Sequence, residues 1–283
     1  MPAPRELLCR DRRLLLEDNA PHIVGILNVT DDSFFDGGLH NSLPAAVSRA
    51  RLLVAEGASI IDIGGQSTRP GYTEVGPDEE IRRVIPVIRE LVRHVAAPLS
   101  IDTYHAAVAD AALSAGAHLV NDIHGLQRDP AMAHVIARHG AAAILMHNDA
   151  TLRDLPADTD VIAHLKTFFT RTLALATAAG IDPARIILDP GIGFGKTQPQ
   201  NLQILSRLSE LHALGHPLLL GISRKSVISH VLDLPPDERL EGTLALTALA
   251  VAQGVQFHRV HDVRANHRAA LMSAAVLASG SQL

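Results

Sequence analysis

Residues 186–197, IILDPGIGFGKT, combine residue types that bind small ligands. The apolar start is typical of a buried strand, and Asp189 closes it. Pro190 and three alternating glycines follow, so the backbone can turn sharply and approach a ligand closely. Asp189 therefore stands at the carboxyl end of an expected strand, which is where α/β folds place their sites.

This segment matches neither of the common glycine-rich phosphate motifs. A P-loop requires a glycine six positions before its lysine, where this chain has Pro190. The dinucleotide fingerprint requires its third glycine one position after Gly195. On its own, the segment would be interpreted as a glycine-rich turn with a solvated acid, so its function depends on the other strand ends.

Polar side chains stand at nearly every expected strand end. In a parallel barrel these ends meet at one mouth, so the groups would surround a single small-molecule pocket. A lone acid such as Asp62 or Asp122 is more often a capping or turn residue, but the whole set is harder to explain that way. The set is Asn28, Asp62, Asp102, Asn121, Asp122, His147, Asp189, Ser223, Arg224, Lys225, Arg259 and His261.

The strand-end groups divide by chemistry. Asp102, Asn121, Asp189 and Lys225 form a mixed donor and acceptor set, which suits the edge of a flat, nitrogen-rich heterocycle. The Asp189 carboxylate can accept two hydrogen bonds from a guanidine-like edge.

A second set is cationic and suits an anion such as a diphosphate. It comprises Arg69, Arg259 and His261, with Thr68 and Asn28 nearby in the expected barrel. The Asn28 amide oxygen is a candidate Mg²⁺ ligand, because Mg²⁺ keeps waters and substrate phosphates as its other ligands. No Cys/His cluster indicates zinc. Long loops at residues 30–39 and 64–76 are candidate lids over this mouth.

The elements that position these groups follow a βα repeat, typical of a parallel sheet. Eight strands are expected, roughly the number that closes a barrel, whereas a doubly wound open sheet is the alternative because spacing does not show closure. We predict an α/β fold, a single (β/α)8 TIM barrel over residues 21–283, with an N-terminal extension or short hairpin at residues 1–20. The expected strands are 22–29, 59–64, 98–103, 118–123, 142–147, 185–189, 217–222 and 256–261, and the expected helices are 44–56, 78–95, 106–114, 130–139, 161–179, 199–214, 226–231 and 240–253.

Composition limits the class of protein. The 283 residues are 47% hydrophobic, enough for a sizeable core, and the net charge of −5 without a basic block argues against nucleic-acid and anionic-membrane partners. No apolar run reaches the length of a membrane span. Cys9 is the only cysteine, and the charged N-terminus has no apolar secretory core, so we expect a cytoplasmic enzyme.

Eight segments in order resemble the dihydropteroate synthase family of folate biosynthesis. They are GILNVTDDSFFDGG, DIGGQSTRPG, SIDT, NDI, LMHN, DPGIGFGK, GISRKS and RVHDV, between about residues 22 and 275. Each segment alone is weak evidence for the family, but eight segments in the family's order, each at an expected strand end, are a specific signal. The resemblance implies a barrel enzyme that joins 6-hydroxymethyl-7,8-dihydropterin diphosphate to 4-aminobenzoate, releasing diphosphate and yielding 7,8-dihydropteroate. It also implies Mg²⁺ and a homodimer.

The resemblance assigns roles position by position. The pterin contacts would be Asp102, Asn121, Asp189 and Lys225, with Met146 as an apolar wall. The diphosphate would be held by Thr68, Arg69, Arg259 and His261, and the metal by Asn28. The aminobenzoate pocket would comprise Phe34, Pro70, Phe194 and Ser226. The catalytic set would be Asp102, Asp189, Lys225, Arg259 and His261.

Three loop positions depart from the common family pattern. Asp31 replaces a usual Pro, Phe35 a usual Ser, and Gln66 a usual Glu. These changes bear on loop order and aminobenzoate affinity more than on pterin binding. Two alternatives therefore stay open: a non-catalytic pterin-binding paralogue, and a methyltetrahydrofolate-dependent methyltransferase, which would have no diphosphate to hold.

Overall fold

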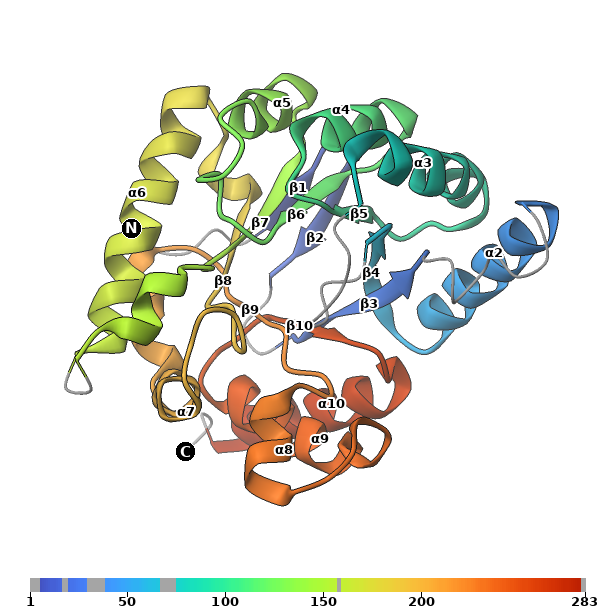
Figure 1. Ribbon diagram of the computed structural model, residues 1–283. Helices are drawn as coiled ribbons and strands as arrows, with labels where there is room; N and C mark the ends of the chain where they lie inside the picture. The colour runs from blue at the N-terminus through green and yellow to red at the C-terminus, as the bar shows by residue number, and fades with distance from the viewer. Residues whose placement is uncertain (1–5, 17–19, 30–38, 67–74, 157–158, 281–283) are drawn as a thin grey trace.

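Eight parallel strands form a ring in the computed structural model, which describes residues 6–16, 20–29, 39–66, 75–156 and 159–280 (Figure 1). Their order is β8-β7-β6-β5-β4-β3-β10-β9. An isolated parallel bridge between Leu188 and Leu218 joins the two ends of this order, so the sheet closes as the predicted barrel. The strands are β3 (His22–Asn28), β4 (Ala58–Gly64), β5 (Leu99–Asp102), β6 (Leu119–Asp122), β7 (Ala142–Met146), β8 (Ile186–Asp189), β9 (Leu219–Leu220) and β10 (Phe257–Val260).

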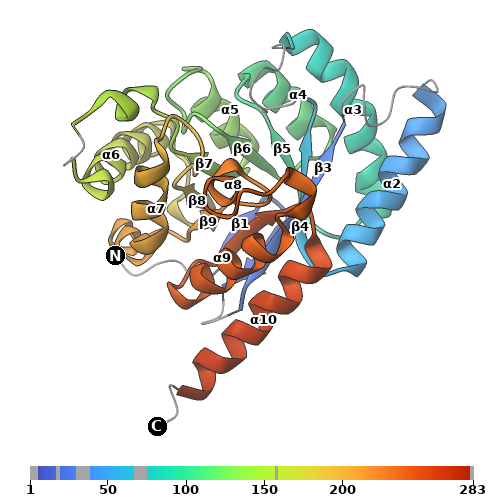
Figure 2. The same ribbon diagram turned by 60° about the horizontal axis from the view of Figure 1, so that its bottom comes forward.

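Helices surround the ring on its outside, as Figures 1 and 2 show from two directions. Among the described residues they are α2 (Leu39–Ala55), α3 (Pro77–His94), α4 (Ala106–Ala115), α5 (Met132–His139), α6 (Val161–Ala179), α7 (Gln198–Ser206), α8 (Ser226–Leu232), α9 (Leu240–Ala252) and α10 (Val263–Gly280). Short 3-10 helices lie at η1 (Ala150–Asp154), η2 (Pro183–Arg185), η3 (Leu208–Leu214) and η4 (Pro236–Glu238). None of these described helices has the length and apolarity required to cross a lipid bilayer.

Side chains alternate between the two faces of each strand, so the barrel has an outer and an inner hydrophobic core. Ile61 and Ile63 belong to the large cluster between sheet and helices, whereas Ile60 belongs to a smaller cluster inside the barrel. The inner cluster also contains Leu119, Ile187, Phe257 and residues of the neighbouring strands. Side chains therefore fill the barrel interior below its mouth.

An amino-terminal hairpin covers the other end of the barrel. It consists of β1 (Glu6–Cys9) and β2 (Arg12–Leu15), paired antiparallel. Leu7 and Cys9 are fully buried in the inner cluster. Arg10 donates from Nη1 to the carbonyl oxygens of Leu113 and Ala117, each at 2.7 Å. The division into an extension at 1–20 and a barrel from residue 21 stays a prediction.

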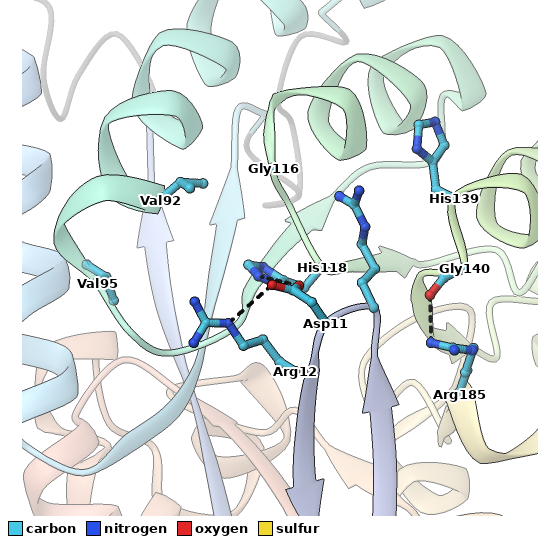
Figure 3. A pocket seen from close by; sticks show the side chains of 10 residues that line it. Asp11, Arg12, Val92, Val95, Gly116, His118, His139, Gly140 and Arg185 are labelled. Carbon is cyan, nitrogen blue, oxygen red and sulfur yellow. Dashed lines mark hydrogen bonds and ion pairs between the residues drawn. The ribbon is translucent and has the colours of Figure 1, made fainter.

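A hollow of about 520 Å³ lies beside the hairpin turn, where Arg10, Asp11 and Arg12 meet the loops that lead into β6, β7 and β8 (Figure 3). Two of its guanidinium groups bind carbonyl oxygens at helix ends: besides Arg10, Arg185 Nη1 donates to the Gly140 carbonyl at 2.6 Å. Helix carboxyl ends carry partial negative charge, which these cations compensate. The hollow thus belongs to the framework at the end opposite the strand-end site.

The structure differs from the predicted elements in several places. α2 begins at Leu39, before the predicted start at residue 44, and β9 covers only Leu219–Leu220 of the predicted strand 217–222. The expected helix at 199–214 is divided at Arg207, whose backbone leaves the helical region at φ −128° and ψ 22°. Its guanidinium contacts Asp160 and Glu210. α10 was missed, although its buried residues Asn266, Ala270 and Ala274 recur every four positions.

Candidate active site

A polar layer stands above the apolar interior at the carboxyl ends of the strands. Two positions after Ile60 and Leu119 come Asp62 and Asn121, and two positions after Ile187 and Phe257 come Asp189 and Arg259. Because side chains two apart share one face of a strand, the same alternation that fills the interior also aims these groups at the mouth. The strand ends therefore converge as predicted. Asp102 contacts Arg259 directly, Asn121 joins them through Asp62, and Asp189 stands beside Lys225.

Arg259 is the hub of this layer. Its Nε donates to Asp62 Oδ2 and its Nη2 donates to Asp102 Oδ2, both at 2.6 Å. The Asn121 amide also donates to Asp62 Oδ2, at 3.1 Å. The Asp62 side chain is fully buried, that of Asp102 is 11% exposed and that of Arg259 is 20% exposed. Two carboxylates thus share one guanidinium, which holds the layer together.

Burial controls the protonation of this hub. It raises the pKa of Asp102 to about 7, against the opposing attraction of the Arg259 guanidinium. Burial also acts to lower the pKa of Arg259, but the negative charges of Asp62 and Asp102 outweigh it, so that pKa is raised. Arg259 stays charged, while Asp102 is sensitive to its surroundings near neutral pH.

Asp189 and Lys225 face each other across the barrel seam. A Cβ added to Gly221 would lie 3.6 Å from Asp189 Oδ2 and 4.0 Å from Lys225 Nζ, so both groups converge on this glycine. The Gly191 amide donates to Asp189 Oδ1 at 2.7 Å, and Lys225 donates to the Ile192 carbonyl at 2.6 Å. Burial raises the pKa of Asp189 and lowers that of Lys225 to about 8, each opposed by attraction to the other.

An apolar wall lines one side of the polar layer. Met146 at the end of β7 clusters with Tyr104 and Ile123, and the partly buried Phe194 packs against them. The Lys225 ammonium lies 4.6 Å from the centre of the Phe194 ring, within the range of a cation–π contact. The polar and apolar faces together fit a flat heterocycle.

His261 and Ser226 occupy the rim of the mouth. His261 follows β10, and both its amide and its Nδ1 contact Ser223 Oγ, at 3.2 and 3.1 Å. Ser226 is exposed at the first position of α8, directly after Lys225. Both residues therefore lie next to the predicted pterin contacts in the chain, on the outer side of the polar layer.

Asn28 lies at the end of β3, beside Gly64 and Asp102. A Cβ on Gly64 would be 3.7 Å from Asn28 Oδ1 and 3.9 Å from the Asp102 Cβ. The described residues contain no group of three or more His, Cys, Asp or Glu side chains that could hold a metal ion. A single amide oxygen fits a Mg²⁺ ion that takes most of its ligands from substrate and water, not a cage made by the protein.

The remaining predicted residues belong to two loops. Phe34, Thr68, Arg69 and Pro70, as well as Asp31 and Phe35, lie outside the residues that the structure describes. Gln66 is described and is buried. Its Nε2 donates to the Tyr104 hydroxyl at 2.8 Å, and its Oε1 accepts from the Val75 amide at 3.3 Å. Gln66 thus connects the two ends of the second loop.

Two residues of the site were missed as functional candidates. Asp62 was included among the polar strand ends but was given no role in the site; it anchors Arg259, and its Oδ1 is buried with no hydrogen-bond partner among the described residues. Its position at a strand end placed it at the mouth, but nothing in the sequence indicated that its partner would be Arg259. Lys196, at the end of the glycine-rich segment, is buried against carbonyl oxygens, and no pattern in the sequence indicated that.

Comparison with known proteins decides the family. The model of the pterin binding enzyme family matches residues 24–261. The chain belongs to this family. The Bacillus subtilis dihydropteroate synthase is 47% identical over 258 residues, covering 91% of this chain and 89% of the relative.

Solved structures of the pterin binding enzyme family agree. A Clostridium difficile dihydropteroate synthase crystallised with pteroic acid has a TM-score of 0.87 and 49% identity, covering 92% of this chain and 97% of that one. A Xanthomonas albilineans dihydropteroate synthase with 4-aminobenzoic acid has a TM-score of 0.89 and 42% identity, covering 97% and 98%.

These findings confirm the predicted barrel and the predicted family. As a pterin binding enzyme of the dihydropteroate synthase type, the chain is a transferase of folate biosynthesis that condenses 6-hydroxymethyl-7,8-dihydropterin diphosphate with 4-aminobenzoate.

Proposed function

We propose that the pterin ring binds over the polar layer, with its guanidine-like edge on Asp189. The carboxylate is fixed by the Gly191 amide and by β8, and it stands beside the Lys225 ammonium. Asn121 and Asp102 supply further polar contacts, and Met146 forms the apolar wall. The observation that supports this placement most strongly is the convergence of Asp189 and Lys225 on Gly221, where the absence of a side chain leaves room for a flat ring.

The diphosphate belongs at the Arg259 side of the mouth. Nη1 of Arg259 takes no part in the contacts with Asp62 and Asp102, so the guanidinium can also face an anion. His261 lies on the same rim, and Arg69 and Thr68 are expected to join from the second loop. Asn28 would hold Mg²⁺, which supplies positive charge beside the phosphate oxygens when bound.

The chemistry that this arrangement supports is charge separation at the pterin methylene carbon. As the C–O bond to diphosphate breaks, positive charge spreads into the dihydropterin, and Asp102 and Asp189 stabilise it electrostatically. Arg259 and His261 stabilise the negative charge on the leaving group. The aniline nitrogen then attacks the carbon, and the acidic anilinium that forms gives its proton to the departing diphosphate or to water, so no strong protein base is required.

The aminobenzoate pocket is proposed on the outer side of the ring. Phe194 forms one wall under Lys225, and Ser226 is exposed beside it, where its hydroxyl can meet a carboxylate. Phe34 and Pro70 are expected to complete the pocket from the two loops. The Xanthomonas albilineans relative binds 4-aminobenzoic acid, which supports a pocket of this kind here.

The decisive experiment follows diphosphate release and dihydropteroate formation in the same samples. Stoichiometric product that requires the pterin diphosphate, 4-aminobenzoate and Mg²⁺ is expected. Pterin binding without product would instead favour the non-catalytic paralogue, and methyl transfer from methyltetrahydrofolate would favour the methyltransferase. Loss of diphosphate binding in an Arg259→Met protein that circular dichroism shows to be folded would tie the anion to the predicted side chain.

The expected homodimer is proposed to form through α9 and α10. These helices lie against each other on one side of the barrel (Figure 2). Their exposed apolar side chains include Leu249, Leu271, Met272 and Val276. An exposed apolar surface of this kind is typical of an interface. Analytical ultracentrifugation should show a dimer that Leu249→Glu with Met272→Glu converts to a monomer; a monomeric parent protein would contradict the proposal. The expected cytoplasmic location and the expected lack of nucleic-acid and membrane partners stay predictions.

A further inference from the structure

A buried ammonium group holds the loop after β8. Lys196 is only 6% exposed, and its Nζ donates to the carbonyl oxygens of Gly191 at 2.8 Å, Phe194 at 2.9 Å and His147 at 3.3 Å. Two of these acceptors belong to the loop at residues 190–197, and the third belongs to the segment after β7. Lys196 therefore connects two segments that lead away from neighbouring strands.

The number of acceptors matches the charged form of the side chain. An ammonium group has three N–H donors, and each finds one carbonyl oxygen here. Lysine is almost never buried unless its charge is compensated. Burial lowers the pKa of Lys196 to about 7, while the nearby Asp189 carboxylate acts in the opposite direction. The energetic cost of burial indicates that this lysine has a specific task.

Glycines allow the close approach that places the ammonium between the segments. Gly191 has φ +66°, and a Cβ there would overlap the His147 carbonyl oxygen. Gly195 has φ +61°, and a Cβ there would lie 2.6 Å from the Asp149 carbonyl oxygen. The loop thus lies directly against residues 147–150, and Lys196 hydrogen bonds across the junction.

The contacts of Lys196 affect the position of Phe194 more than that of Asp189. Phe194 provides one of the three carbonyls, and its ring lies under the Lys225 ammonium. The backbone of Asp189 is held by the sheet, because its carbonyl accepts from the His147 amide at 2.9 Å, and only the Gly191 amide at the start of the loop contacts its carboxylate. Loosening the loop would therefore displace Phe194 more than the Asp189 carboxylate.

We propose that Lys196 is a positioning residue that fixes Phe194 as a wall of the aminobenzoate pocket by tying the 190–197 loop to the segment after β7. It acts without touching either substrate. This inference rests on the proposed function, in which Phe194 contacts 4-aminobenzoate and Asp189 contacts the pterin. It assigns a role to a buried charge that the reaction itself does not use.

The test compares Lys196→Met with Lys166→Met, which removes a lysine charge from α6. Lys196→Met should raise the KM for 4-aminobenzoate by about tenfold or more, since small misplacements of a pocket wall weaken productive binding strongly. The Kd of the pterin diphosphate, measured by calorimetry without 4-aminobenzoate, should change by less than about threefold, as expected for a site that does not share the contact. Lys166→Met should change neither value. Equal losses of both affinities, or no loss of either, in Lys196→Met would overturn the proposal.

A double-mutant cycle with Phe194→Ala provides the second measurement. If Lys196 acts through Phe194, Lys196→Met should add less than about threefold to the KM of Phe194→Ala, because the two changes remove one interaction. Additive effects would overturn the proposal. Should Lys196→Met not fold, Lys196→Gln, which keeps two donors, serves in its place under the same criteria. A parent enzyme that forms no dihydropteroate at all would instead contradict the proposed function.

Discussion

Removal of the Arg259 guanidinium is expected to destabilise the barrel strongly. Arg259→Met leaves the Asp62 side chain at 0% exposure and that of Asp102 at 11% without their shared cation. Breaking a buried ion pair by removing one partner typically costs about 3–5 kcal/mol, because an uncompensated charge stays buried. We expect a loss of about 3–5 kcal/mol in the free energy of unfolding at pH 8.

Arg138→Met is the matched control. Arg138 Nη2 lies 2.6 Å from Asp110 Oδ1, the same distance as in the buried pairs, but these side chains are 61% and 43% exposed. Exposed ion pairs contribute about 0–1 kcal/mol, since water screens the charges and the side chains lose freedom. The difference between the two variants therefore measures the effect of burial at constant distance.

The effect of Arg259→Met should depend on pH. Burial raises the pKa of Asp102 from 3.8 to about 7, so between these values the native state binds a proton that the unfolded state does not. Stability from this group therefore falls as pH rises through that window. Loss of Arg259 raises the pKa of Asp102 further, so the variant should regain part of its stability at pH 5, where the carboxyl group is protonated in the native state.

The assay is urea unfolding followed by circular dichroism at pH 5 and pH 8. The reasoning predicts a large loss for Arg259→Met that is smaller at pH 5, and a small loss for Arg138→Met at both values. Similar losses in the two variants would refute the argument from burial. A loss in Arg259→Met that is identical at both pH values would refute the argument from Asp102 protonation.

Three further predictions concern the strand-end site. Asp189→Ala should abolish measurable pterin binding in calorimetry while the melting curve stays native, because the carboxylate is a mouth residue held by Gly191; unchanged affinity would contradict its role. Gly191→Ala should destabilise the protein in thermal melts far more than Gly140→Ala, since both have positive φ but only Gly191 has a carbonyl oxygen in the way; equal melting temperatures would show that the contact is unimportant. Pterin affinity should fall as pH rises through about 8, where Lys225 loses its charge, and Lys225→Arg should remove that fall; a fall that persists in Lys225→Arg would assign the titration to another group.

Much of the fold could be predicted because the apolar residues repeat clearly at strand and helix spacing. The eight expected strands all occur, and the positions of Asp102, Asn121, Asp189 and Arg259 at their ends follow from strand polarity alone. α10 was missed because its inward positions are small residues and an Asn, which give a weak apolar stripe. Asn266 is buried because its side chain contacts Thr247 and the Asp262 carbonyl, which the sequence does not reveal.

The site was predicted less completely than the fold, for a physical reason. The sequence shows that a side chain stands at the end of a strand, but it does not show which partners that side chain contacts across the barrel. Asp62 and Arg259 are 197 positions apart in the chain, and their contact depends on closure of the whole ring. Lys196 was missed because its partners are backbone carbonyls, which any sequence supplies. The roles expected for Phe34, Thr68, Arg69 and Pro70 stay predictions.

The single bridge between Leu188 and Leu218 gives the barrel a weak seam, since β9 contributes only Leu219–Leu220 to regular pairing. Asp189 ends β8 and Lys225 follows β9, so the two residues stand on opposite sides of this seam. A ligand held by both groups would therefore clamp together the edges that the backbone itself joins least firmly. Substrate binding would then make local opening of the ring less frequent. Amide exchange in β8 and β9 should slow as the pocket fills.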